Sequence, residues 1–140
     1  MANLMQGKRG LIMGVANNRS IAWGIAQAMH AEGAQLAFSY QGEAFGKRVE
    51  PLAAELGSDI LVDMDVTDDA ALDSGFAALW QRWDSIDFLI HAIAYSDKEE
   101  LTGRFIDTSR ANFKNSLDIS CYSLIEVARR VAPKMVNGGT

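Results

Sequence analysis

The chain has 140 residues, of which only one is cysteine, two are proline and two are histidine. A single cysteine, Cys121, excludes an internal disulfide framework and is typical of a reducing compartment, so we expect a cytoplasmic protein. Apolar runs are short. None approaches the roughly 20 residues that cross a bilayer, and residues 1–10 lack the apolar core of a secretory signal. We therefore expect no membrane span and no export signal.

Basic residues are also scarce. Lys and Arg number 13 against 18 Asp and Glu, which gives a net charge of −5. This balance disfavours nucleic acid as a partner, because contacts with phosphates need clustered cations. No group of His, Cys, Asp or Glu has the spacing of metal ligands. We expect neither nucleic acid nor a metal ion to bind.

What the chain does contain is a regular alternation of apolar runs and helical patterns. Hydrophobic residues make up 49% of it and charged residues 22%, which suits a packed core in one domain spanning residues 1–140. Four short runs are expected as buried strands, at residues 11–13, 36–40, 60–64 and 88–94. Apolar residues at helical spacing follow each run, over residues 21–29, 45–56, 72–83 and 113–128.

This alternation predicts a doubly wound, Rossmann-like α/β fold. Right-handed crossovers would join the strands into a parallel sheet of order 3-2-1-4, with helices on both faces. Thr67 is expected to cap the third helix, and Cys121 to be a core thiol on the fourth, over about residues 110–132. A complete fold of this class needs further strands after residue 140, so we interpret the chain as the N-terminal part of a longer one-domain enzyme. The alternative is a small nucleotide-binding module.

The loop after the first expected strand is typical of a dinucleotide-binding unit. An apolar run ends at Gly14, and a helical pattern begins near Ser20 and Ile21. In such units a glycine permits close backbone approach, and N–H groups at the helix start receive a pyrophosphate. No G-x-G-x-x-G motif is present and one glycine is a weak signal, so an ordinary strand-to-helix turn stays open at this point.

The second and third expected strands end in polar residues where the adenosine half of a cofactor would lie. Dinucleotide folds commonly place an acid after the second strand to bind the ribose 2′-hydroxyl, but Gln41 stands there. Gln41 could bind the adenosine end or form a polar turn, so this position does not decide between NADH and NADPH. After the third strand, Asp65 can accept from the adenine amine and the Val66 backbone can meet the ring edge. The alternative for Asp65 is a turn or capping role.

The fourth expected strand ends in His91-Ala92-Ile93-Ala94. Small residues there would let the ribose and nicotinamide approach the backbone. No carboxylate lies nearby in the sequence to orient His91, so we interpret it as a packed or surface histidine rather than a general base. The polar loop over residues 95–100 is expected at the substrate mouth or, alternatively, as a plain solvated loop.

Taken together, these segments resemble the opening half of the bacterial enoyl-acyl-carrier-protein reductases, a divergent branch of the short-chain dehydrogenases. The similarity covers essentially the whole chain and is carried by Gly14-Val15-Ala16, residues 20–29, residues 32–38, residues 56–60, Asp65-Val66, Asp118-Ile119-Ser120 and Tyr122-Ser123. It implies cofactor contacts at Gly14, Ser20, Ile21, Gln41, Asp65, Val66 and Ile93, and a substrate contact at Ser96. Ala94 stands where some relatives have glycine, which would tighten the nicotinamide pocket.

The resemblance also implies a reaction. It is hydride transfer from NADH, with NADPH not excluded, to C3 of a trans-2-enoyl thioester carried by acyl carrier protein in fatty acid synthesis. The family's catalytic Tyr and Lys belong to a Tyr-x6-Tyr-x6-Lys segment after the fifth strand, and this chain does not contain that segment. We therefore expect the catalytic residues beyond Thr140. Tyr95 and Tyr122 are not their counterparts.

Assembly is implied in the same way. Short-chain dehydrogenases assemble through the helix that matches residues 110–132, which here carries additional apolar residues at Ile119, Ile125 and Val127. The resemblance thus implies a homotetramer.

Two alternative functions stay open. A carbonyl-reducing short-chain dehydrogenase would normally end its fourth strand in an Asn-Asn-Ala-Gly type of sequence, which is not the sequence here. A non-catalytic nucleotide-binding module would leave the fourth strand as an unpaired apolar edge.

Overall fold

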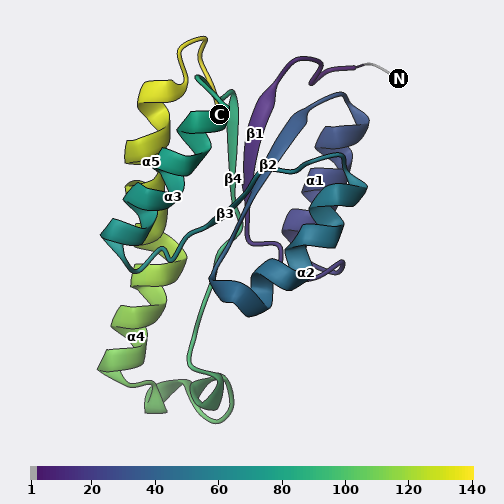
Figure 1. Ribbon diagram of the computed structural model, residues 1–140. Helices are drawn as coiled ribbons and strands as arrows, with labels where there is room; N and C mark the ends of the chain where they lie inside the picture. Colours follow the sequence, from purple (N-terminus) through teal and green to yellow (C-terminus); the bar gives the residue numbers. More distant parts are fainter. Residues whose placement is uncertain (1–2) are drawn as a thin grey trace.

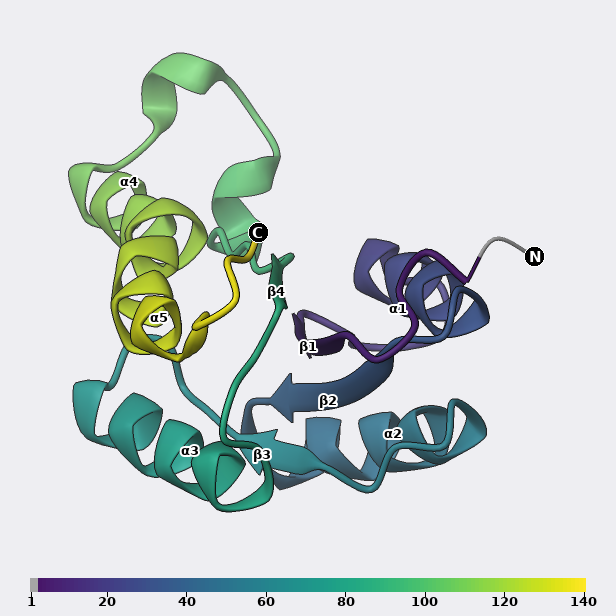
Figure 2. The same cartoon turned by 90° about the horizontal axis from the view of Figure 1, so that it is seen from above.

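The computed structural model describes residues 3–140 (Figure 1). Its centre is a sheet of four parallel strands, β1 (Arg9–Met13), β2 (Gln35–Tyr40), β3 (Leu61–Asp63) and β4 (Phe88–His91), in the order β3-β2-β1-β4. Helices α1 (Ile21–Ala31) and α2 (Gly42–Glu55) cover one face, and α3 (Asp69–Arg82), α4 (Arg110–Leu117) and α5 (Ser123–Val131) lie on the other side (Figure 2). None of the helices in this part of the chain has both the length and the apolar surface that crossing a membrane takes. The predicted fold class and strand order are confirmed.

β1 is apolar on both sides because helices cover both faces of the sheet. Successive strand residues point to opposite faces. Leu11 and Met13 accordingly belong to the core beneath α3 and α5, whereas Ile12 belongs to the core beneath α1 and α2. All three side chains are fully buried. A continuous apolar run is therefore the pattern that a central parallel strand requires.

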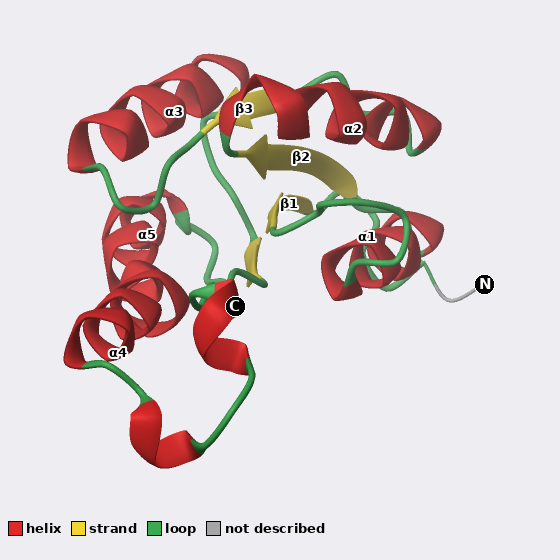
Figure 3. Ribbon diagram, turned by 90° about the horizontal axis from the view of Figure 1, so that it is seen from below, coloured by secondary structure: helices red, strands yellow, loops and turns green. Residues whose placement is uncertain are grey.

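The connection from β4 to α4 extends beyond the carboxyl end of the sheet (Figure 1), and seen from below it arches away from the strands before it reaches α4 (Figure 3). It contains two short 3-10 helices, Lys98–Leu101 and Phe105–Asp107. β4 itself ends at His91, earlier than the predicted strand at residues 88–94, because the chain leaves the sheet at that point. β3 is likewise shorter than the predicted residues 60–64, and β1 begins earlier, at Arg9.

The predicted cap of α3 is wrong by one residue. Asp68 is the N-cap, and its carboxylate accepts from the backbone N–H groups of Ala70 and Ala71 at 2.9 and 3.3 Å. A carboxylate at this position also interacts favourably with the helix dipole. The hydroxyl of Thr67 instead donates to Asp65 Oδ1 at 2.6 Å. Thr67 is thereby turned toward the carboxyl edge of the sheet.

The fourth predicted helix contains a π-helical turn, Asp118–Tyr122, between α4 and α5. Over the whole predicted helix, residues 110–132, the buried residues are Asn112, Ser123, Glu126, Val127 and Val131. The predicted apolar stripe is largely exposed, with Phe113, Leu117 and Leu124 each about half exposed and Cys121 on the surface. The prediction of a core thiol is therefore wrong. The cause is that this helix buries Val127 and Val131 against α3 and turns the polar side chains of Asn112 and Ser120 toward the chain that follows β4, so that a different face is buried from the predicted one.

The outer edge of β4 meets the last residue of the chain. Thr140 donates its N–H to the carbonyl of Asp87 at 3.2 Å and accepts from the N–H of Leu89 at 2.9 Å. These two bonds are those of a parallel ladder, in which one residue bonds to two alternate residues of its neighbour. Thr140 thus pairs with β4 in the same parallel orientation as the other strands.

Candidate functional site

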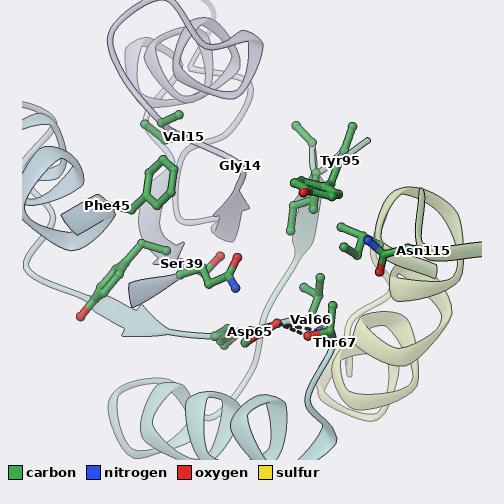
Figure 4. A pocket seen from close by; sticks show the side chains of 17 residues that line it. Gly14, Val15, Ser39, Phe45, Asp65, Val66, Thr67, Tyr95 and Asn115 are labelled. Atoms are coloured by element: carbon green, nitrogen blue, oxygen red, sulfur yellow. Dashed lines mark hydrogen bonds between the residues drawn. The ribbon is translucent and has the colours of Figure 1, made fainter. Parts of the chain in front are cut away.

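A cleft of about 610 Å³ lies where the carboxyl ends of the strands pass into the loops that follow them. Every strand contributes to it, through residues 14–16, 39–41, 64–67 and 92–95, and Phe45, Asn115 and Ile119 complete the walls (Figure 4). The strand order reverses between β1 and β4. In open α/β sheets, ligands bind at the carboxyl edge beside such a reversal.

Gly14 connects β1 to this cleft, and its backbone admits no side chain. Its φ is +109°, a conformation that residues with a Cβ rarely adopt. A Cβ built there would also collide with the carbonyl oxygen of Ala92, just after β4. The glycine predicted for close approach therefore lets two neighbouring loops meet at the point where the strand order reverses, and it lines the cleft as well.

Ser20 supports the loop between β1 and α1. Its Oγ accepts from the N–H groups of Ala16 and Asn17 at 2.9 and 3.1 Å. The hydroxyl is thus directed back into the loop and makes no capping bond to α1. Ile21, the first residue of α1, is 80% exposed. The amino end of α1 can therefore present backbone N–H groups to an anion, which is the usual role of this helix end in dinucleotide folds.

Asp65 is an ionised acceptor in the wall after β3. Its Oδ1 accepts from both the hydroxyl and the backbone N–H of Thr67, at 2.6 and 2.9 Å. The hydrogen bond from the Thr67 side chain is the main cause that lowers the pKa of Asp65 below its ordinary value. Bonds from the Thr67 backbone and from Gln41 act in the same direction, and partial burial opposes them. The turn fixes this carboxylate beside Val66 in the cleft (Figure 4).

The wall after β4 is held by the π-helical turn. Ser120 Oγ accepts from the N–H of Tyr95 at 2.9 Å and donates to the carbonyl of the same residue at 3.2 Å. Ile119, the preceding residue of that turn, lines the cleft, as does Ile93 after β4. π-Helical turns occur often at functional sites, and here the turn sets the distance between two walls of the cleft.

Ser96 lies just outside the cleft lining. Its Oγ accepts from Asn112 Nδ2 at 3.1 Å, and Asn112 Oδ1 accepts from the N–H of Asp97 at 2.8 Å. Asn112 is buried. The side-chain amide of Asn112, on α4, therefore holds the start of the connection after β4 against that helix through two hydrogen bonds.

His91 is half-buried and turned toward α5, not toward the cleft. Its Nε2 lies 2.8 Å from Ser123 Oγ, which itself donates to the carbonyl of Ile119 at 2.7 Å. Because that hydroxyl has a single proton, Nε2 of His91 donates to it. Burial lowers the pKa of His91. A half-buried histidine bonded to a serine and turned away from the cleft agrees with the interpretation of His91 as a packed or surface residue rather than a general base.

One Tyr-x6-Lys spacing does occur in the chain, at Tyr40 and Lys47. Tyr40 is the last residue of β2, and Lys47 lies on α2, where its Nζ is 3.0 Å from Glu43 Oε1. This pair does not follow a fifth strand, and the lysine is committed to an exposed ion pair. It does not form a catalytic pair.

The structure brings five of the eight predicted contact residues into one cleft and leaves three outside its lining. Those that line it are Gly14, Gln41, Asp65, Val66 and Ile93, and those outside it are Ser20, Ile21 and Ser96. Sequence reasoning missed Phe45, Thr67 and Asn115. Helical spacing offered a signal for two of them, because Phe45 lies four residues after Gln41 and Asn115 four residues before Ile119.

The cleft suits binding more than proton transfer. Its ionisable side chains are Asp65, Tyr40 and Tyr95. None of them has a partner arranged for acid–base exchange among the hydrogen bonds of residues 3–140. Polar groups that follow β2 and β3 lie at one end, and Ala92, Ile93 and Ala94, which follow β4, line the other with apolar side chains. A nicotinamide dinucleotide, polar at its adenosine end and flat at its nicotinamide, fits this arrangement.

Comparison with known proteins agrees with that geometry. A family model described as enoyl-(acyl carrier protein) reductase matches residues 14–140. Enoyl-[acyl-carrier-protein] reductase [NADH] 2 of Rhizobium meliloti is 56% identical over all of this chain, and the FabI protein of Rickettsia bellii is 51% identical over 98% of it. In both cases the match covers 52% of the relative. The chain therefore spans about half the length of the curated relatives it matches.

Solved structures of the same family of reductases are also similar to this chain. FabI from Candidatus Liberibacter asiaticus superposes with a TM-score of 0.97 at 52% identity, over 99% of this chain and 54% of its own. The reductase from Anaplasma phagocytophilum in complex with NAD superposes with a TM-score of 0.93 at 51% identity, over 97% of this chain and 52% of its own. From the family match and from this identity along nearly its full extent, we conclude that the chain belongs to the enoyl-(acyl carrier protein) reductase family.

Proposed function

We propose that the full-length protein reduces a trans-2-enoyl thioester on acyl carrier protein with NADH, in fatty acid synthesis. The observation that carries the proposal is the cleft at the carboxyl edge of the sheet, with Gly14, Asp65 and Ile93 on three of its walls. Relatives more than half identical are named as NADH-dependent reductases, and one similar structure holds NAD. These residues form the cofactor side of the site.

Each predicted contact has a role in this proposal. Gly14 and the amino end of α1, at Ser20 and Ile21, receive the pyrophosphate through backbone N–H groups. Gln41, Asp65 and Val66 bind the adenosine half, and the backbone at Ile93 faces the nicotinamide. We assign Ser96, which follows Tyr95 of the cleft lining, to contact with the substrate.

The proton chemistry is assigned to residues beyond Thr140. When bound, NADH supplies a hydride to C3 of the enoyl group. The enolate that develops needs a hydrogen-bond donor, and the cleft residues of this chain provide none placed for that purpose. We assign this role to the Tyr and Lys of the Tyr-x6-Tyr-x6-Lys segment. The chain is then the N-terminal part of a one-domain enzyme whose fifth strand continues the pairing that Thr140 makes with β4.

We further propose that the enzyme works in the cytoplasm as a homotetramer. The support is the exposed apolar surface of α4, the π-helical turn and α5, which includes Phe113, Leu117, Leu124 and Ile125. Large exposed apolar surfaces of this kind usually mark interfaces between proteins. Light scattering of the full-length protein at micromolar concentration should give the mass of four chains, and a monomer alone would exclude this assembly.

The reaction itself is tested by following NADH absorbance with crotonyl thioester as substrate. The full-length protein should consume NADH only when the thioester is present. A simple ketone or aldehyde offered in place of the thioester distinguishes a carbonyl reductase. Faster oxidation of NADH with the carbonyl compound would refute the proposal.

A further inference from the structure

An acidic side chain reaches the end of β2 from the neighbouring strand. β2 ends without an acid, since Tyr40 is followed by Gln41 and Gly42. Asp63, the last residue of β3, points across to this position, and its Oδ1 accepts from the N–H of Gly42 at 3.0 Å. The sequence pattern alone hides this contact, because the two residues are 21 positions apart.

The sheet itself places this carboxylate. Tyr40 and Asp63 are paired in the parallel register of β2 and β3, and the N–H of Met64 donates to the carbonyl of Tyr40 at 2.8 Å. The two strands therefore end side by side at the carboxyl edge. Gly42 has a φ of +78°, and the position that its Cβ would occupy is open space. No side chain at Gly42 screens the carboxylate of Asp63 from a ligand beside Gln41.

The neighbouring charges give this corner an acidic character. Asp65 lines the cleft, Asp63 lies just outside that lining two residues earlier, and Glu43 occupies the first turn of α2. Helix α2 also carries two cations. Lys47 is paired with Glu43 at 3.0 Å, and the guanidinium of Arg48 lies over the ring of Phe45, 5.7 Å from its centre. Neither cation is paired with Asp63 in the described residues.

We infer that Asp63 is the residue that makes this site select NADH over NADPH, an inference that rests on the proposed function. In dinucleotide folds the ribose 2′-position is bound at the end of the second strand, where an acid accepts a hydrogen bond from the hydroxyl and an arginine accommodates a 2′-phosphate. Asp63 supplies the acid from β3 in place of the missing one. It also occupies the Gly42 N–H, a donor that a phosphate would otherwise use.

Repulsion between like charges decides the selectivity. A 2′-phosphate beside an exposed carboxylate meets a force that solvent weakens and salt screens, so removing the charge should change NADPH affinity by about five- to tenfold. A 2′-hydroxyl still finds an acceptor when the carboxylate is replaced by an amide. NADH affinity should therefore change less than about threefold.

The test uses the full-length protein and direct binding of NADH and NADPH, followed by cofactor fluorescence without substrate. In Asp63→Asn, NADPH should bind about five- to tenfold more tightly while NADH binding is nearly unchanged. Asp59→Asn is the matched control. It removes the same charge before the opposite end of β3, where Asp59 pairs with Arg82 at 2.8 Å, and it should leave both affinities as they are.

A second measurement needs no variant. In the unaltered protein the ratio of the NADPH to the NADH dissociation constant should fall as salt rises from 20 to about 500 mM, because salt screens the repulsion. A ratio that neither salt nor Asp63→Asn changes would overturn the role of Asp63 while leaving the reductase proposal intact. Failure of the unaltered protein to bind either cofactor would overturn the proposed function and this inference with it.

Discussion

Asp65 and Thr67 form a small closed turn at the centre of the cleft wall. One carboxylate oxygen accepts both the backbone and the side-chain hydrogen of Thr67. This turn lowers the pKa of the Asp65 carboxyl, chiefly through the Thr67 hydroxyl, and fixes the carboxylate before any ligand arrives. A fixed acceptor loses little conformational freedom on binding, which is the condition under which one hydrogen bond contributes most.

Asp65→Ala in the full-length protein should weaken NADH binding by about 1–2 kcal/mol, the scale of a lost charge-assisted hydrogen bond. Isothermal titration calorimetry measures the change directly. Asp69→Ala, in the first turn of α3 four residues further on, is the control and should bind NADH as the unaltered protein does. An unchanged dissociation constant in Asp65→Ala would remove Asp65 from the adenosine site.

Alanine substitutions at Gly14 and Gly24 should change the free energy of unfolding in opposite directions. Gly14→Ala forces a Cβ into a left-handed backbone and against the carbonyl of Ala92, so it should lower the free energy of unfolding by about 2–4 kcal/mol. Gly24 is exposed in α1 and a Cβ there meets nothing within 4 Å. Gly24→Ala should therefore raise stability by up to about 1 kcal/mol. Urea unfolding of both variants is the measurement, and equal stabilities would contradict the account of Gly14.

At the scale of elements, α5 is tied to the molecule by a buried carboxylate. Glu126 accepts from Tyr122 and Arg129 at 2.6 Å and from Arg130 at 2.8 Å, and Arg130 also reaches Asp73 on α3 at 2.7 Å. The hydrogen bond from the Tyr122 hydroxyl, followed by those from the two arginines, lowers the pKa of Glu126 from 4.5 to about 2. This network orients the helix whose π-helical turn forms one wall of the cleft.

The pH dependence of stability follows from that shift. The folded pKa is depressed, so the contribution of Glu126 is fully present above the unfolded pKa of 4.5 and is lost as pH falls toward about 2. Glu126→Gln should consequently flatten the fall in the free energy of unfolding between pH 5 and about pH 2.5. Glu55→Gln, at the end of α2, is the control. Urea unfolding series at several pH values test this, and parallel curves for Glu126→Gln and the unaltered protein would contradict it.

The segment formed by α4 and α5 also shows which contacts the sequence pattern does not predict. The four strands followed from alternation, since a parallel sheet under two helical layers needs continuous apolar runs such as residues 11–13. Their order followed from the doubly wound pattern of dinucleotide-binding folds. The contact face of α4 and α5 did not, because Asn112, Ser120 and Ser123 bind backbone and a histidine through hydrogen bonds that hydrophobic periodicity does not detect. Asp63 was missed for a related reason: its partner, Gly42, is brought near only by the register of two strands.

At the scale of the whole molecule, the cleft lies along the carboxyl ends of all four strands. Phe45 on α2, Asn115 on α4 and Ile119 in the π-helical turn complete its walls. Thr140 pairs with β4 along the outer edge of that strand. In the proposed enzyme the rest of the fold would stand on this side and close the nicotinamide half of the site. Cofactor binding would then belong mainly to this chain, and proton chemistry to the rest of the full-length protein.

This division predicts that a fragment of residues 1–140 does not reduce an enoyl thioester, although the full-length protein does. The ionisable groups of the cleft are Asp65, Tyr40 and Tyr95, and Tyr95 has its backbone, not its hydroxyl, fixed by Ser120. Losing one donor to a developing oxyanion typically costs roughly 10²–10³ in rate, and the fragment would lack the tyrosine, the lysine and part of the pocket together. NADH absorbance with crotonyl thioester is followed for both proteins, with circular dichroism to establish that the fragment is folded. Comparable turnover by a folded fragment would mean that a catalytic group lies within this chain.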